Sequence, residues 1–373
     1  MAIASFLGGM GSTAAGYVLP FLFVLTIVVF FHELGHFLVA RWCGVAIKTF
    51  SIGFGPELVG FTDRKGTRWR ISLVPLGGYV RFLGDDSEVS TADRDALAAM
   101  SPEERSRTFA GKGVAARAAI VAAGPIANFI LAIVIFTAIF GVMGRQSVTA
   151  KVDTVVAGSA AEKAGFQPGD MVVSIDGRPV KTFADLQQIV SFKAGEQLTI
   201  VVERAGQDVS LTATPISNRD GVGILGIGRD PKATDIITEH YSLPGAVGMG
   251  ISETWFIADR TLTYLGGVVT GHQSAAQLGG PIRVAEVAAQ VATFGIVALV
   301  NLAAVLSVSI GLINLFPIPM LDGGHLLYFL AEAVRGRPLS ERVQDIGFRV
   351  GLAAVLALMF FATWNDIIHL SSL

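Results

Sequence analysis

The sequence predicts a polytopic α-helical membrane protein with four transmembrane helices and one inserted soluble α+β domain. The composition is the first observation: 52% of the 373 residues are hydrophobic, only 16% are charged, and the mean hydropathy is +0.59. Soluble domains carry about 25% charged residues, so the composition argues against an ordinary soluble enzyme. The apolar residues gather in four long runs, and a stretch between the second and third runs has the pattern of a folded soluble domain.

The four apolar runs are long enough to cross a bilayer. The sequence places them at 17–43, 118–143, 291–316 and 346–364. The first run is too long for the core of a signal peptide, and no Lys or Arg precedes it. Lys and Arg are concentrated after the first and third runs, so the positive-inside rule puts those segments in the cytoplasm and both termini outside.

Charge, cysteine content and symmetry narrow the function classes. The net charge of −2 gives no reason to expect a nucleic-acid partner. The single cysteine, Cys43, excludes an intrachain disulfide and a multi-cysteine zinc site. No repeat relates the two halves, which disfavours a transporter. The lipid bilayer is therefore the expected environment of the apolar part of the chain.

Residues 144–230 have the pattern of a small folded domain. Runs such as MVVSID and LTIVVERAG predict strands, and the spacing of FADLQQIVSF predicts a helix between them. The segment resembles a PDZ domain of the bacterial protease type at 160–165, 168–170 and 175–177. The resemblance implies one inserted α+β PDZ domain, and an unrelated small α+β domain is the alternative.

The chain is thus expected to have four parts. They are an N-terminal membrane half at 1–143, the PDZ domain at 144–230, a linker with an amphipathic surface segment at 231–290, and a C-terminal membrane half at 291–373. The amphipathic segment is the run PIRVAEVAAQVA, whose spacing suits a helix at the membrane surface.

The first apolar run contains the motif HELGH at 32–36. On a helix, His32 and His36 lie one turn apart on one side and can hold one ion between them. Glu33 lies beside that pair, where it can reach a water at the metal without being a ligand. Ionisable groups inside a membrane helix are costly and mark functional sites. The alternative is that the histidines form hydrogen bonds with other helices.

A catalytic zinc ion needs three protein ligands and an open position, so one ligand is missing from HELGH. The best donor is Asp322 in the run NLFPIPMLDGG, and His325 is its competitor. The prolines interrupt the third apolar helix, which is tolerated where the backbone lines a protein cavity. The first and third spans run in the same direction, so Asp322 is expected at a depth similar to that of the histidines.

HELGH in the first span, NLFPIPMLDGG near the third and the PDZ-like insert between them resemble the site-2 protease family of intramembrane metalloproteases. The similarity is greatest to its bacterial regulator-of-sigma-E protease branch. It implies one zinc ion per chain, bound by His32, His36 and Asp322, with Glu33 as the catalytic base. Well-known members of this branch carry two tandem PDZ domains, whereas one is evident in this sequence.

Residues 69–82 have the pattern of an apolar β-hairpin that turns at 76–78. The resemblance implies a membrane-associated β-hairpin whose edge holds the unwound substrate by β-augmentation. A plain cytoplasmic hairpin is the alternative. The resulting substrate-binding candidates are Ile71, Leu73, Gly77, Gly78 and Tyr79.

Two asparagines near the motifs are further candidates. Asn314 is polar and close in sequence to Asp322, and the resemblance implies a hydrogen bond to the substrate backbone; helix packing is the alternative. Asn128 ends the run GPIAN in the second span, which resembles the family's GPxxN pattern. Gly124 and Asn128 suit close helix packing with a polar contact, and this structural interpretation is the one we favour from the sequence.

The sequence therefore predicts an intramembrane zinc metalloprotease that cuts single-span membrane proteins within or near their transmembrane segment. The resemblance implies an anti-sigma factor as substrate, with remnant signal peptides as a further class, in a stress response. It also implies prior trimming by an upstream site-1-type protease. The location implied is the bacterial cytoplasmic (inner) membrane, with the PDZ domain outside the cytoplasm. The alternative function is a catalytically silent membrane scaffold that holds partners through its PDZ domain.

Overall fold

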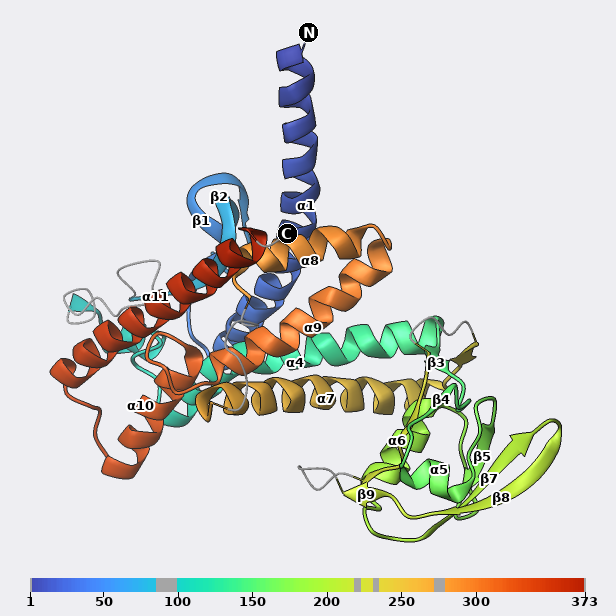
Figure 1. The fold of residues 1–373 in the computed structure, drawn as a ribbon. Coiled ribbons are helices and arrows are strands. Elements are labelled where there is room, and N and C mark those ends of the chain that lie inside the picture. The colour runs from blue at the N-terminus through green and yellow to red at the C-terminus, as the bar shows by residue number, and fades with distance from the viewer. Residues whose placement is uncertain (1, 85–98, 218–222, 231–234, 272–278, 372–373) are drawn as a thin grey trace. The chain divides into compact units, whose positions relative to one another are not determined.

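The computed structural model describes residues 2–84, 99–217, 223–230, 235–271 and 279–371 (Figure 1). The chain divides into two compact units. We call Met1–Ile139 together with Leu243–Leu373 the membrane unit, and Phe140–Ser242 the inserted unit.

Within the described residues, four helices of the membrane unit are long and apolar enough to cross a membrane, as the sequence predicted. The helices are α1 (Ala2–Trp42), α4 (Val114–Val142), α9 (Ile296–Asn314) and α11 (Glu341–Ser371). The third predicted span was too long at its start. Gly295 has a φ of +99°, which separates α9 from the preceding helix, so the apolar helix begins at Ile296.

Helix α1 is packed on several sides. Val24 and Val28 are buried against Leu299 and Ala303 of α9. A Cβ placed on Gly35 would lie 2.2 Å from the carbonyl oxygen of Ala123, so α1 and α4 approach too closely there for any side chain. The segment of α1 that carries the HELGH motif is thus held against α4.

The membrane unit also contains helices that are not candidate membrane spans. They are α3 (Pro102–Ser106), α7 (Leu243–Val269), α8 (Pro281–Ala292) and α10 (Asp322–Arg335). Helix α7 fills 27 residues of the segment expected to be a linker. The sequence did not predict this helix because it contains several glycines. One of these glycines explains how the helix packs. A Cβ on Gly250 would lie 2.6 Å from Oγ1 of Thr137, so α7 lies directly against α4.

Helix α8 coincides with the predicted amphipathic run. Its first turn has no side-chain cap of its own. Instead, the buried carboxylate of Asp366 in α11 accepts hydrogen bonds from the backbone N–H groups of Gly280, Ile282 and Arg283, at 2.8, 3.1 and 3.1 Å. A carboxylate at a helix N-terminus satisfies unpaired donors and complements the helix dipole, so this contact fixes α8 to α11.

The β-structure of the membrane unit differs in its pairing from the predicted hairpin. Strands β1 (Ile47–Thr62) and β2 (Arg68–Phe82) pair with each other, and the turn between them falls at 63–67. Ile71 and Gly78 both pair with Ile52, so the two halves of β2 lie on either side of the same part of β1. The prediction that 69–82 forms a hairpin paired with itself was therefore wrong, because both halves pair with β1.

The inserted unit is built on a four-stranded sheet in the order β6-β5-β7-β8. Its core residues include Val172, Ile175, Leu198, Ile200 and Val202, which are all buried. The unit extends beyond the predicted end at 230, because β12 pairs with β3. The elements are β3 (Arg145–Val148), β4 (Thr154–Val155), α5 (Ala160–Ala164), β5 (Met171–Ile175), β6 (Arg178–Pro179), α6 (Phe183–Ser191), β7 (Leu198–Arg204), β8 (Gln207–Ala213), β9 (Ile216–Ser217), β10 (Gly223–Ile224), β11 (Ile227–Gly228) and β12 (Ile236–Glu239).

The inserted unit contains a buried ion pair between Asp170 and Arg204. Asp170 is 1% exposed, and its carboxylate accepts two hydrogen bonds of 2.7 Å from the guanidinium of Arg204. Burial alone would raise the pKa of Asp170, but Arg204 and the backbone N–H of Gln167 outweigh it and lower that pKa. We expect Arg204→Met to destabilise the unit by about 3 kcal/mol, because it leaves the buried charge of Asp170 without its cationic partner.

Hydrogen exchange of β5 and β7 in the full-length protein would measure this change. The exposed Arg178, replaced by Met, is the matched control and is expected to leave exchange unchanged. Equal effects of the two variants would refute the role given to the Asp170 ion pair.

Candidate active site

Two helices bring three donor atoms to one point. The Nε2 atoms of His32 and His36, one turn apart on α1, lie 3.2 Å from each other. Asp322 is the first residue of α10. Its Oδ2 lies 3.2 Å from Nε2 of His32 and 3.6 Å from Nε2 of His36. The residues predicted as ligands from the sequence are thus brought together.

The three donors fit a zinc ion. Zinc lies about 2.0–2.2 Å from nitrogen and oxygen ligands in a tetrahedral arrangement, so its ligand atoms are roughly 3.3–3.5 Å apart. The three observed separations centre on that value. Oδ2 of Asp322 is buried and has no hydrogen-bond partner among the described residues. A buried carboxylate oxygen without a donor is costly, and a cation at this point would satisfy it.

A cavity of about 290 Å³ opens beside these donors. Glu33 lines it together with the three donor residues, although Glu33 is not one of the converging donors. His325, the competitor for third ligand, lines the cavity but is also outside that donor group. The site thus combines three possible metal ligands with the carboxylate of Glu33 and a cavity that has room for a peptide.

Sequence comparison decides the family. The profile of Peptidase family M50 matches residues 20–358. This chain belongs to peptidase family M50. It is a metalloprotease of the site-2 protease type, as the sequence predicted.

Curated proteins match this M50 peptidase over nearly its whole length. A protein of Agrobacterium fabrum named as a candidate zinc metalloprotease is 50% identical, over 94% of this chain and 96% of its own. Metalloprotease MmpA of Caulobacter vibrioides is 43% identical, covering 93% and 94%. Regulator of sigma-E protease RseP of Escherichia coli is 32% identical, covering 93% and 97%. That last alignment runs over 448 positions, so RseP contains sequence with no counterpart in these 373 residues.

Two solved PDZ domains match part of the M50 chain. They come from the SdrC-like proteins of Listeria monocytogenes and Listeria innocua and cover 21% and 25% of this chain, and 82% and 97% of their own. Their identities are 19% and 18%, and their TM-scores are 0.19 and 0.20. Scores of this size do not establish a fold, so the PDZ assignment of the inserted unit stays a prediction.

The substrate-binding candidates of the M50 site fall into two groups. Gly78, Tyr79 and Asn314 line the cavity. Ile71 and Leu73 are 50% and 56% exposed on β2 and are not among the lining residues. Gly77 is not a lining residue either; a Cβ there would lie 2.5 Å from the ring of Phe54. The second half of β2 therefore reaches the site, and the first half does not.

Close packing explains the glycines around the site. A Cβ on Gly78 would lie 3.0 Å from Cγ of Glu33, so β2 passes directly over that side chain. Cβ atoms on Gly323 and Gly324 would lie 2.3 and 2.4 Å from the carbonyl oxygens of Leu315 and Ile318. The two glycines after Asp322 thus allow α10 to start against the preceding loop, which fixes the position of the carboxylate.

Helix α4 forms the floor behind the histidines, which the sequence alone did not indicate. The carbonyl oxygen of Ile120 lies 2.9 Å from Nδ1 of His36, and the amide of Asn128 lies 3.3 Å from Nδ1 of His32. Gly124 lies between these two positions, and a Cβ there would lie 2.3 Å from Nε2 of His36. The packing role predicted for Gly124 therefore includes packing against the ligand rings.

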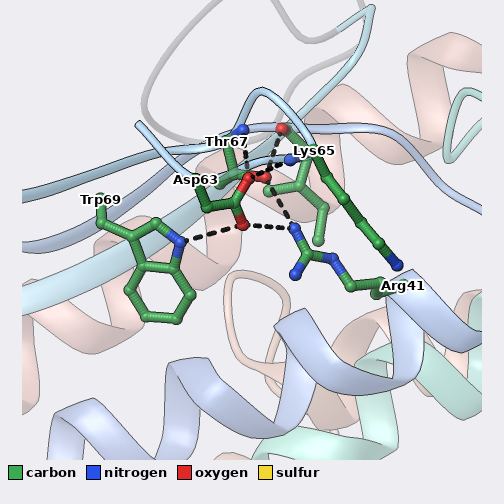
Figure 2. Close-up of polar contacts among 6 residues, drawn as sticks. Arg41, Asp63, Lys65, Thr67 and Trp69 are labelled. Atoms are coloured by element: carbon green, nitrogen blue, oxygen red, sulfur yellow. Dashed lines mark hydrogen bonds and ion pairs between the residues drawn. The ribbon is translucent and has the colours of Figure 1, made fainter. Parts of the chain in front are cut away.

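Figure 2 shows how the turn between β1 and β2 is attached to the end of α1. The carboxylate of Asp63 accepts a 2.6 Å hydrogen bond from Arg41 at the end of α1 and a 3.3 Å bond from the indole of Trp69. It also accepts from the backbone N–H groups of Lys65 and Thr67, at 2.9 and 3.0 Å. Burial opposes ionisation of the carboxyl, but these donors prevail and hold the pKa of Asp63 well below its usual range.

We expect Asp63→Ala to lower the free energy of local unfolding of the β1–β2 turn by about 1.5–3 kcal/mol, because it removes hydrogen bonds to a charged acceptor. Hydrogen exchange of 57–70 should accelerate at least tenfold, with metal content unchanged. Since the pKa of Asp63 is lowered by folding, its contribution is complete above about pH 4 and is lost as the pH falls below that value. Lys65→Ala, which removes no donor to Asp63, is the control; an equal acceleration there would contradict the role of the carboxylate.

Proposed function

We propose that this chain hydrolyses a peptide bond within or near the transmembrane segment of single-span membrane proteins, using one zinc ion held by His32, His36 and Asp322. The observation that carries the proposal is that the unpartnered carboxylate oxygen of Asp322, at the start of α10, meets the two histidines of α1, a helix apolar enough to span a membrane. Ionisable groups at such a position indicate function, because lipid makes them costly.

Glu33 acts as the general base. A zinc ion held by His32, His36 and Asp322 would act as a Lewis acid toward the scissile carbonyl and would acidify the attacking water. Glu33 takes the proton of the attacking water and passes it to the amine nitrogen that leaves. The side chain of Asn314 lines the same cavity and can hold the substrate backbone by a hydrogen bond.

The substrate must unwind before it is cut, because a helix keeps each carbonyl in an internal hydrogen bond. Gly78 and Tyr79 lie in the half of β2 that lines the cavity, so this strand can accept the extended peptide by β-augmentation. Ile71 and Leu73 lie in the exposed half of β2, where their apolar side chains suit contact with lipid rather than with the scissile bond.

The substrates proposed are an anti-sigma factor and remnant signal peptides, after trimming by an upstream site-1-type protease. Support comes from the match to RseP, whose name is that of a regulator of sigma-E. The location proposed is the bacterial cytoplasmic (inner) membrane. The distribution of Lys and Arg supports extracytoplasmic termini and an extracytoplasmic inserted unit of PDZ type. The single predicted PDZ domain of this chain is proposed to select its substrates outside the membrane.

Metal analysis of the purified full-length protein tests the ligand set. We expect about one zinc per chain in the wild type and a large loss in Asp322→Ala, because a catalytic site needs three protein ligands. His325→Ala is the matched control, since His325 lines the same cavity without belonging to the donor group. If His325→Ala lost the metal and Asp322→Ala kept it, the proposed ligand set would be wrong. A wild type without metal would favour the scaffold function instead.

A further inference from the structure

We propose that Asn128 is a positioning residue for the metal site: its side-chain amide accepts the Nδ1 proton of His32 and so fixes both the tautomer and the orientation of that ligand. Sequence analysis favoured a helix-packing role for Asn128. The structure places its side chain at the back of the ring of His32, with the amide nitrogen Nδ2 3.3 Å from Nδ1. The inference rests on the ligand set proposed above.

The tautomer follows from which ring nitrogen faces the other donors. Nε2 of His32 points to Asp322 and His36. It must therefore be the unprotonated ring nitrogen, whose lone pair binds the metal, when a metal is held. The ring proton of the neutral imidazole then lies on Nδ1 and needs an acceptor. Metal-binding histidines almost always donate this second proton to an oxygen, which sets their orientation.

Asn128 can supply that oxygen. It is 0% exposed, and its Oδ1 has no hydrogen-bond partner among the described residues. The orientation of a side-chain amide is assigned from its hydrogen-bond network. A half turn of the amide places Oδ1 against Nδ1 of His32, so one rotation satisfies both the buried oxygen and the ring proton.

The second histidine shows the same arrangement. Nδ1 of His36 lies 2.9 Å from the carbonyl oxygen of Ile120. Ile120 and Asn128 are eight residues apart on α4, so they lie about two turns apart along the helix and about 80° apart around its axis. Helix α4 thus provides one oxygen acceptor for each of the two histidines.

Asn128 is itself held in place, as a positioning residue must be. Its backbone carbonyl accepts a 2.9 Å hydrogen bond from Oγ of Ser307 on α9. A Cβ on Gly311 of α9 would lie 3.1 Å from the Cβ of Asn128, so the two helices are in close contact there. A buried amide is costly in an apolar bundle unless it has a polar partner, and His32 is the one that the geometry provides.

The test compares metal binding by full-length variants in detergent. We measure zinc affinity by competition with a chelator, and we record the visible absorption of the Co²⁺-substituted protein. We expect Asn128→Leu and Asn128→Ala to weaken zinc binding about 10- to 100-fold, the range typical of lost outer-shell partners, and to change the Co²⁺ spectrum. Asn128→Asp keeps an acceptor for the ring proton and should bind zinc within about threefold of the wild type.

Ser307→Ala is the packing control, because it removes a contact to Asn128 without touching His32. It should bind zinc like the wild type. If Asn128→Leu cannot be purified in folded form, Asn128→Ala decides the question, since it introduces no larger side chain. Zinc affinity within twofold of the wild type in the alanine variant, or an equal loss in Ser307→Ala, would overturn the inference.

The two proposals can fail separately. If Asp322→Ala binds zinc as tightly as the wild type, the ligand set is wrong, and the positioning role of Asn128 falls with it. If Asp322→Ala loses zinc while Asn128→Ala keeps normal affinity and spectrum, the ligand set stands and only the role of Asn128 is refuted.

Discussion

Glu33→Gln is expected to reduce turnover by a factor of about 10²–10⁴ while leaving the zinc content unchanged. Glu33 lines the cavity beside the three donors but is not one of them, so its replacement by glutamine leaves all three proposed ligands in place. Glutamine has nearly the same size and fits the same space below Gly78, but its amide cannot take a proton from water. The chemical step therefore loses its base, and the site keeps its shape.

The measurement is single-turnover cleavage of a single-span membrane protein by purified enzyme in detergent, with zinc determined on the same sample. Glu33→Asp is the matched control: it retains a carboxylate on a shorter side chain and should keep more activity than Glu33→Gln. Cleavage by Glu33→Gln at the wild-type rate would exclude Glu33 as the base. Loss of zinc in that variant would instead make Glu33 a ligand.

The parts of the fold that the sequence predicted are those with a strong local signal. The four apolar helices follow from runs of residues that only lipid or a core can accommodate. The pair His32 and His36 follows from helical spacing alone, because residues four apart share a face. The convergence of Asp322 with the histidines could be predicted only through the argument about membrane depth and the resemblance to a family, since Asp322 lies 286 positions after His36 in the sequence.

The parts that the sequence missed depend on contacts between segments. Helix α7 is rich in glycine and has no strong hydropathy, and its packing against Thr137 of α4 becomes visible only in the structure. Gly77 and Gly78 look like a hairpin turn, but the two halves of β2 pair with Ile52 and its neighbours rather than with each other. The proximity of Asn128 to His32 depends on the register of α4 against α1, which no local pattern specifies.

Gly124→Ala is expected to remove the metal and with it the activity, although it adds a single methyl group. The added Cβ would lie 2.3 Å from Nε2 of His36 and 2.9 Å from Cε1 of His32, so it would enter the space of both rings. The ring of His36 cannot easily move away, because Nδ1 is held by the carbonyl oxygen of Ile120. Helices α1 and α4 are in close contact at Gly35, so moving them apart to make room for the methyl group would break that packing.

We expect zinc affinity to fall at least 100-fold in Gly124→Ala, measured by chelator competition on the purified full-length protein. The matched control is Gly248→Ala in α7, a helical glycine with no atom within 4 Å of an added Cβ. Alanine generally stabilises a helix interior by about 0.5–1 kcal/mol relative to glycine, so the control should fold at least as well as the wild type and keep its zinc. If Gly124→Ala retained both zinc and activity, the close approach of α4 to the histidines would be disproved, since a contact of 2.3 Å cannot coexist with an intact site.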